Sequence, residues 1–313
     1  MTRRDKIVVI GAGNVGEAIA YTLMVRMQAN DIVLIDVNEN RAKGAALDIA
    51  HGTSFFKDVN VKQGGYEECR DARVIIITAG VARKPGQSRL DLAKINVGIV
   101  KSITENIMEY ASNPLILVVS NPADITTAAV LETSELSPKR VIGSGTSLDT
   151  ARLRYLLSEK LKVNIEDVNA YVVGEHGDSQ VPVFSSANIG GFLLDDYCSQ
   201  AGITLDKEEV ARRTRDGGAE VIKLKGATFY GIAMAVSNII EAIMRDDRAI
   251  IPVCHVLGER FGEWAGVPVS LPCRIGWDGI EKTFMVSMNE EEKAAMENSV
   301  KILKEFMKSV KNA

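Results

Sequence analysis

The sequence predicts an α/β protein in which a doubly wound parallel sheet precedes a second, α+β domain. Three observations lead to this fold class. Short β-rich runs alternate with helical stretches through the first half, a glycine motif follows the first run, and the rhythm changes after about residue 160. The chain has 313 residues, more than one compact core of ordinary size holds. We therefore expect two domains, residues 1–145 and residues 146–313.

The elements of the first domain follow from composition and from the spacing of apolar residues. Runs of β-branched residues predict strands, and two of these runs are almost entirely apolar, as strands buried on both faces are. The expected order is strand 6–10, helix 14–26, strand 31–36, helix 41–52, strand 72–80, helix 89–111, strand 115–122 and strand 140–145 as the last strand of the sheet. This alternation predicts a parallel sheet with helices on both faces.

The second half combines polar helices with strand-like runs that fit antiparallel ribbons, for example residues 168–174 and 274–288. Near the C-terminus, apolar residues recur at helical spacing. They are Met296, Val300, Leu303, Met307 and Val310. We expect them to form one face of an amphipathic helix that packs on the second domain.

Composition and charge exclude several classes of function. The net charge of −4 gives no reason to expect nucleic acid or a membrane surface as a partner. No apolar stretch is as long as a membrane span, and the short apolar run after the basic N-terminus leads into the glycine motif. The four cysteines lack metal-ligand spacing, so we expect no metal site and free thiols in a reducing cytoplasm.

The motif "GAGNVG" places Gly11, Gly13 and Gly16 between a predicted strand and a predicted helix, as in Rossmann dinucleotide-binding domains. The first glycine allows a tight turn, the second lets a pyrophosphate approach the backbone, and the third lets helix and strand pack closely. Asp36 follows at the end of the next strand, where a carboxylate binds ribose hydroxyls and repels a 2′-phosphate. These features predict NAD as the cofactor, although Arg41 lies near enough to weaken the preference over NADP.

Three residues of the second half suit one reaction. His176 stands in a glycine-flanked turn, and Asp149 and Arg152 are three apart at the start of a helix, hence on one face. Each alone has an ordinary structural explanation. Together they suit a 2-hydroxy acid that gives its hydroxyl proton to a neutral imidazole near pH 7 and its C2 hydride to nicotinamide. Asp149 would orient the imidazole, and Arg152 would hold the substrate carboxylate by two parallel bonds.

Six motifs together resemble the L-lactate/malate dehydrogenase family, most closely the bacterial L-lactate dehydrogenases. They are "GAGNVG", "RKPGQSRLDL", "VVSNPADI", "IGSGTSLDTARLR", "GEHGDSQVPVFS" and "KGATFYGIA". The resemblance implies that His176 is the proton acceptor, Asp149 its orienting carboxylate and Arg152 the carboxylate clamp. It implies further substrate contacts from Arg89, carried by a closing lid, and from Asn121 and Thr228. It also implies cofactor contacts from Asn14, Val15, Arg41, Gly80, Asn96, Val119 and Asn121.

One residue that bears on the choice of substrate is Arg83, six residues before Arg89. In the family this position reads the far end of the substrate, with Gln in lactate enzymes and Arg in malate enzymes. An arginine that closes over a methyl group would be buried without a partner, whereas a second carboxylate would pair with it. Arg83 therefore indicates malate and oxaloacetate. The motifs "GEHGD" and "KGATFYGIA" resemble the lactate branch, and we favour (S)-lactate and pyruvate, with malate as the alternative.

For regulation and oligomeric state, the only guide in the sequence is the resemblance to the family. Many bacterial lactate enzymes bind fructose 1,6-bisphosphate through an Arg and a His. Here Arg154 matches the Arg, but Asn169 stands at the His position, so this allosteric site is incomplete. The family implies a homo-oligomer, either a dimer or a tetramer. The competing hypotheses are a non-catalytic NAD-binding scaffold and a metal-dependent sugar-directed relative. The intact His176, Asp149, Arg152 and Arg89 argue against the scaffold.

Overall fold

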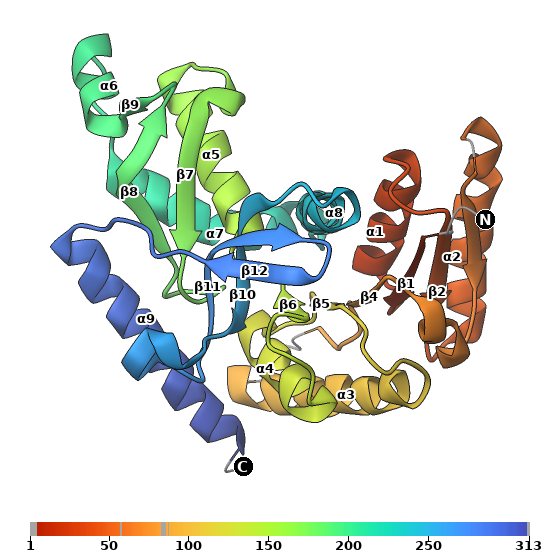
Figure 1. The fold of residues 1–313 in the computed structure, drawn as a ribbon. Helices are drawn as coiled ribbons and strands as arrows, with labels where there is room; N and C mark the ends of the chain where they lie inside the picture. Colours follow the sequence, from red (N-terminus) through yellow and green to blue (C-terminus); the bar gives the residue numbers. More distant parts are fainter. Residues whose placement is uncertain (1–4, 57, 83–85, 87, 312–313) are drawn as a thin grey trace.

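A computed structural model describes residues 5–56, 58–82, 86 and 88–311 of the chain. The expectation for Arg83 therefore falls outside the described residues. Figure 1 shows a large sheet that runs through the molecule, helices on its two faces, and a smaller antiparallel sheet beside one end. This arrangement matches the fold class that the sequence predicts.

Six parallel strands form the first part of the large sheet, in the order β3-β2-β1-β4-β5-β6. Their bounds are β1 (Lys6–Ile10), β2 (Asp31–Ile35), β3 (Asn60–Gln63), β4 (Val74–Ile77), β5 (Ile116–Val118) and β6 (Val141–Gly143). The strand order reverses direction between β1 and β4. In open α/β sheets, ligands bind at this point, outside the carboxyl ends of the strands.

Helices cover both faces of this sheet (Figure 1). One apolar core lies under α1 (Asn14–Val25), α2 (Glu39–His51) and α8 (Tyr230–Arg245). The opposite core lies under α3 (Arg89–Tyr110) and α4 (Ala123–Ser134). Strand β1 contributes Ile7 and Val9 to the first core and Val8 and Ile10 to the second. A strand that is buried on both faces in this way gives the continuous apolar run seen in the sequence.

The sheet does not end at β6, contrary to the expectation for strand 140–145. Three antiparallel strands from the second half continue it, namely β10 (Ala249–Val256), β11 (Pro268–Gly276) and β12 (Gly279–Thr283). Strand β10 joins β6 where Cys254 faces Gly143. A Cβ atom on Gly143 would lie 2.3 Å from the Thr127 hydroxyl oxygen. This long-range pairing leaves no local signal, which is why the sequence did not reveal it.

The second sheet is antiparallel, as the sequence predicts for this half, and consists of β7 (Val168–Val173), β8 (Val181–Ile189) and β9 (Phe192–Leu193). It shares an apolar core with α5 (Ser147–Leu161), α6 (Leu194–Ala201) and α7 (Lys207–Lys225). The connection between β7 and β8 carries His176.

The C-terminal helix α9 (Glu290–Lys311) uses the apolar face that the sequence predicts. Met296, Val300 and Leu303 are buried, and Met307 and Val310 are partly buried against the same cluster. Four short 3₁₀ helices complete the described elements, at Gly52–Phe55, Tyr66–Asp71, Ile165–Asp167 and Glu259–Trp264. None of the helices in the described part of the chain is long and apolar enough to cross a bilayer.

Candidate active site

A cavity of about 1020 Å³ opens at the carboxyl ends of β1, β2 and β4, where the strand order reverses. Its wall includes Gly11 and Gly13 of the glycine loop, Asp36 and Arg41 after β2, and Gly80 after β4. Apolar side chains of α3 complete it, at Ile95, Ile99 and Ile103. An elongated ligand with polar and apolar parts fits such a lining.

The three motif glycines have different surroundings, and these suit a bound phosphate. Gly11 has a φ of +108°, and a Cβ atom there would lie 2.7 Å from the Ala79 nitrogen. A Cβ atom on Gly16 would lie 1.8 Å from the Gly11 carbonyl oxygen, so only glycine lets α1 begin this close to the loop. Gly13 faces open space, and no side chain caps the N-terminus of α1 behind it. Free N–H groups at a helix N-terminus attract anions.

Asp36 and Arg41 both reach the glycine loop at Ala12. The Asp36 carboxylate accepts hydrogen bonds from the main-chain nitrogens of Ala12 at 2.7 Å and Asn38 at 2.9 Å. Arg41 donates from Nε to the Ala12 carbonyl oxygen at 2.7 Å and lies 3.5 Å from the Glu17 carboxylate. The carboxylate therefore stands at the cavity wall, and the charge of Arg41 is partly neutralised by an acid of α1.

Asn96, one of the predicted cofactor residues, makes hydrogen bonds to two loops beside the cavity. Its side chain is 2% exposed and donates to the Asn121 carbonyl oxygen at 2.7 Å. It also exchanges hydrogen bonds with the main chain of Val81, at 2.9 and 3.2 Å. Asn96 thereby ties the loop after β4 to the loop after β5. Among the other predicted cofactor residues, Asn14 and Val15 lie in the first turn of α1, and Val119 follows β5, buried.

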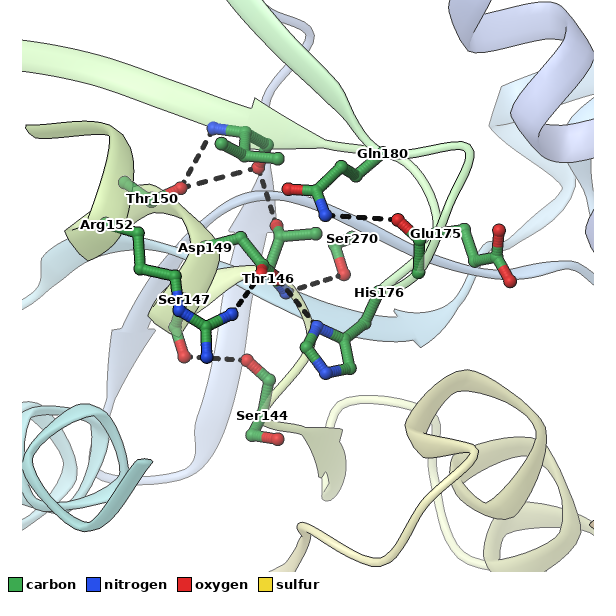
Figure 2. Close-up of polar contacts among 12 residues, drawn as sticks. Ser144, Thr146, Ser147, Asp149, Thr150, Arg152, Glu175, His176, Gln180 and Ser270 are labelled. Atoms are coloured by element: carbon green, nitrogen blue, oxygen red, sulfur yellow. Dashed lines mark hydrogen bonds and ion pairs between the residues drawn. The ribbon is translucent and has the colours of Figure 1, made fainter. Parts of the chain in front are cut away.

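In residues 146–313, the predicted base and the predicted clamp both contact the predicted carboxylate (Figure 2). The Asp149 carboxylate is 1% exposed and accepts a hydrogen bond from His176 Nδ1 at 2.6 Å. Its other oxygen accepts one from an Arg152 terminal nitrogen at 2.9 Å. The His176 side chain remains 26% exposed. One buried carboxylate thus holds both a proton-transfer group and a guanidinium at the same opening.

Local structure explains why these side chains meet. Asp149 and Arg152 lie one turn apart in the first turns of α5, which places them on the same face. The His176 loop is fixed by its preceding residues. Gly174 has a φ of +89° and pairs with the main chain of Ser270. The Glu175 nitrogen donates to the Ser299 hydroxyl at 2.9 Å.

Charges around the imidazole control its protonation. The negative charge of Asp149, aided by the hydrogen bond between the two side chains, raises the pKa of His176 to about 9 against the opposing effect of burial. Burial disfavours ionisation of Asp149, but His176 and Arg152 outweigh it and lower the pKa of Asp149. The sequence suggested a neutral imidazole near pH 7. The raised pKa favours the charged imidazolium at neutral pH, the form that donates a proton, whereas the neutral ring is the form that accepts one.

The other predicted substrate residues lie in three places. Arg89 is the first residue of α3 and pairs with Glu175 at 2.9 Å and Asp178 at 3.2 Å, on either side of His176 in the sequence. Asn121 precedes α4, in the loop that Asn96 holds. Thr228 lies half-buried in the connection between α7 and α8, where no hydrogen bond joins it to the described residues of the site.

Arg154 and Asn169 do not join this site. Arg154 donates from Nε to the Ala170 carbonyl oxygen at 3.0 Å and stacks on the ring of Tyr171. Asn169 pairs with the side chain of Asn188 at 3.3 Å. Arg154 lies two residues after Arg152, on another face of the helix, as helical spacing predicts. Arg154 and Asn169 both make contacts within this chain.

Sequence reasoning missed two buried acids that contact the site. Glu175 holds Arg89, and Asp124 accepts a hydrogen bond from the His176 main-chain nitrogen at 2.8 Å. In the sequence, Asp124 looks like an ordinary acid at a helix N-terminus. Only the packing of α4 against the β7–β8 connection reveals its partner. Among the residues that the structure describes, no cluster of His, Cys, Asp and Glu is arranged to hold a metal.

Comparison with known proteins identifies the family of the chain. The model of the lactate/malate dehydrogenase NAD binding domain matches residues 5–143, and that of the α/β C-terminal domain matches residues 146–313. An L-lactate dehydrogenase of Nitratidesulfovibrio vulgaris is 42% identical over 306 residues, covering 97% of this chain and 99% of that protein.

Two solved structures resemble the whole chain. A minor L-lactate dehydrogenase of Enterococcus mundtii is 37% identical, covers 98% of each chain and has a TM-score of 0.94. A malate dehydrogenase of Picrophilus torridus is also 37% identical, covers 99% of this chain and 98% of that one, and has a TM-score of 0.92. The chain belongs to the lactate/malate dehydrogenase family.

Proposed function

We propose that the protein is an NAD-dependent L-lactate dehydrogenase that interconverts (S)-lactate and pyruvate. The observation that carries the proposal is the contact of His176 and Arg152 with one buried carboxylate, Asp149. A continuous set of contacts links this group to the cavity. Val81 lines the cavity, Asn96 joins Val81 to Asn121, and α4, which follows Asn121, contacts the His176 loop through Asp124.

Each side chain has a defined task in pyruvate reduction. Arg152 binds the substrate carboxylate with its planar guanidinium, and this fixes the orientation of the keto group. The imidazolium of His176 gives its Nε2 proton to the keto oxygen, and in lactate oxidation the neutral ring takes that proton back. Asp149 holds the ring by Nδ1 and stabilises its charged form. When bound in the glycine-lined cavity, the nicotinamide cofactor supplies or accepts the hydride.

A division of labour between the two halves follows from this proposal. Residues 1–145 would bind the cofactor, and residues 146–313 would supply the base, its carboxylate and the clamp. Arg89 would be the second cation, polarising the carbonyl as negative charge develops on its oxygen. Asn121 and Thr228 would complete the substrate pocket, and Gly11, Gly13, Asp36 and Gly80 the cofactor contacts.

We also propose a homo-oligomer, a dimer or tetramer, in the cytoplasm. Large apolar side chains are exposed on α1, α2 and α8, including Tyr21, Leu47, Tyr230 and Met234, as expected for faces that associate. All four cysteines are free and buried, which suits a reducing compartment. The molar mass in solution, measured by sedimentation or light scattering, decides between monomer, dimer and tetramer.

Malate dehydrogenase activity is the alternative, and Arg83 is the observation that favours it. The test is the ratio of kcat/KM for pyruvate to that for oxaloacetate, followed through the absorbance of NADH. We expect the wild-type chain to prefer pyruvate. If Arg83 faces the substrate, Arg83→Gln raises that ratio by about tenfold or more, since a close charge pair contributes a few kcal/mol.

Three results would contradict parts of this proposal. A wild-type preference for oxaloacetate would make the protein a malate dehydrogenase. A ratio that Arg83→Gln leaves unchanged would mean that Arg83 faces away from the substrate. No NADH oxidation with either acid would leave only a non-catalytic NAD-binding scaffold.

A further inference from the structure

Asp124 is a second buried carboxylate beside His176, and it comes from the opposite half of the chain. It lies in the first turn of α4, is 3% exposed, and accepts the His176 main-chain N–H at 2.8 Å through Oδ2. Its other oxygen, Oδ1, is buried and accepts no hydrogen bond from a nitrogen or hydroxyl group of the described residues, and the neighbouring Cys254 thiol contributes a hydrogen bond to the carboxyl. A buried carboxylate with so few donors around it costs free energy that an apolar residue would not.

The charges at the site explain why such a carboxylate is useful there. Asp149 is shared between His176 and Arg152, so one negative charge serves two cations. The positive charge of Arg152 opposes protonation of the imidazole, whereas Asp124 favours it. A second negative charge offsets part of the repulsion between the two cations.

We propose that Asp124 is a positioning residue for His176, which fixes its loop through the main chain and favours the imidazolium through its charge. The inference rests on the proposed function, because it assigns Asp124 a task in the same proton transfer. Asp124 touches no reacting atom. It acts through the position and protonation of a group that does.

The other titratable groups near Asp124 and His176 do not supply a free negative charge to the imidazole. Glu175, in the same loop as His176, is paired with Arg89. Cys254 of β10 is a neutral thiol that hydrogen-bonds to Asp124, because burial, aided by the charge of Asp124, raises the pKa of Cys254 well above its ordinary value. Burial also raises the pKa of Asp124 to about 6, so the carboxylate is mostly ionised at neutral pH. Its charge is therefore present where pyruvate reduction would operate.

The test separates the charge of Asp124 from its hydrogen bond. Asp124→Asn keeps an oxygen that can accept the His176 N–H, removes the charge and replaces the other oxygen with an amide nitrogen of similar size. Titration of the His176 ring by NMR in the full-length, ligand-free chain then reports its pKa without turnover. We expect a pKa lower by about half a unit or more than in the wild type. Glu132→Gln, an exposed site on the same helix, is the control and leaves the pKa unchanged.

Kinetics provide a second measurement. In Asp124→Asn, the alkaline fall of kcat/KM for pyruvate moves toward lower pH by the same amount, while KM at pH 6 stays within about twofold. An unchanged His176 pKa, or a uniform loss of kcat with no shift of the alkaline limb, would reduce Asp124 to a structural residue. A wild-type chain that does not reduce pyruvate would refute the proposed function, and the NMR titration would still test Asp124.

A second variant and a wild-type measurement test the same role if Asp124→Asn does not fold. If Asp124→Asn does not fold, Asp124→Ser, which also keeps an oxygen acceptor and lacks the charge, takes its place with the same expected shift. In the wild type, the amide resonance of His176 must also report the ionisation of the carboxyl to which it donates. An amide shift that stays constant across the acid range would overturn the link between the two residues.

Discussion

The cavity that we propose for the cofactor and the cluster that we propose for catalysis, namely Asp149, His176 and Arg152, are built in opposite ways. The cavity depends on glycines that carry no side chain, since Gly13 faces open space and Gly16 leaves room for the carbonyl of Gly11. The catalytic cluster depends on charges that are present and buried, at Asp149, His176 and Arg152. We therefore expect one added methyl group to impair the stability or NADH binding of the first region. In the second region, we expect the loss of one charge or of the proton carrier to impair turnover.

The two regions also differ in how far their parts lie apart in the sequence. The glycine loop spans six residues, and Asp36 follows at the end of the next strand. The catalytic cluster joins residues of α5 to a loop 27 residues later, and Asp124 joins that loop from 52 residues before it. The glycine loop of the cavity is a local motif, whereas the cluster is assembled entirely by tertiary packing.

The largest effect is expected from the catalytic cluster. His176→Asn removes the group that carries the proton and keeps a polar side chain of similar size. We expect kcat/KM for pyruvate to fall by about a thousandfold or more, since general acid–base catalysis contributes factors of this order. NADH binding, measured by fluorescence titration, should stay within about twofold, because the cavity lies in the other half. A variant with wild-type turnover would show that another group transfers the proton.

A pair of glycine variants tests the cavity. Gly16→Ala places a methyl group 1.8 Å from the Gly11 carbonyl oxygen, so the loop and α1 must separate. We expect the free energy of unfolding to fall by about 3 kcal/mol, measured by denaturant titration. Gly13→Ala is the matched control, because nothing in the fold lies within 4 Å of the added atom.

The control variant, Gly13→Ala, is expected to affect NADH binding more than stability. Gly13→Ala should change the free energy of unfolding by only about 0.5 kcal/mol or less. It should nevertheless weaken NADH binding by about tenfold, because the methyl group stands where the pyrophosphate approaches the backbone. Equal losses of stability in the two variants would mean that the glycines have no separate roles.

The pH dependence of turnover in the wild-type chain tests the charge of the imidazole without any substitution. In the mechanism that we propose, pyruvate reduction requires protonated His176, whose pKa is raised to about 9 by Asp149. The value of kcat/KM for pyruvate should therefore be level near neutral pH and fall about tenfold per pH unit above that pKa. Lactate oxidation requires the neutral ring, so its kcat/KM should rise with pH up to the same value. A pyruvate profile that falls near pH 6 would show that Asp149 does not support the charged ring.

Prediction from the sequence succeeded where the signal was local. The parallel sheet, the glycine loop and the amphipathic face of α9 follow from residue type and spacing, and the structure confirms these elements. The motifs also singled out His176, Asp149 and Arg152, which the structure brings into contact. Prediction failed for the end of the sheet, because β6 and β10 pair across more than a hundred residues.

The sequence by itself determined the fold class, the family and the residue types available for proton transfer and carboxylate binding. Periodicity and short motifs act over a few residues, so they can be recognised without knowing the fold. Only the tertiary structure decided the protonation of His176, the pairing of Arg89 with Glu175, and the contact between Asp124 and the catalytic loop. Burial and the distance between charges set these properties, and both arise only when distant segments pack together.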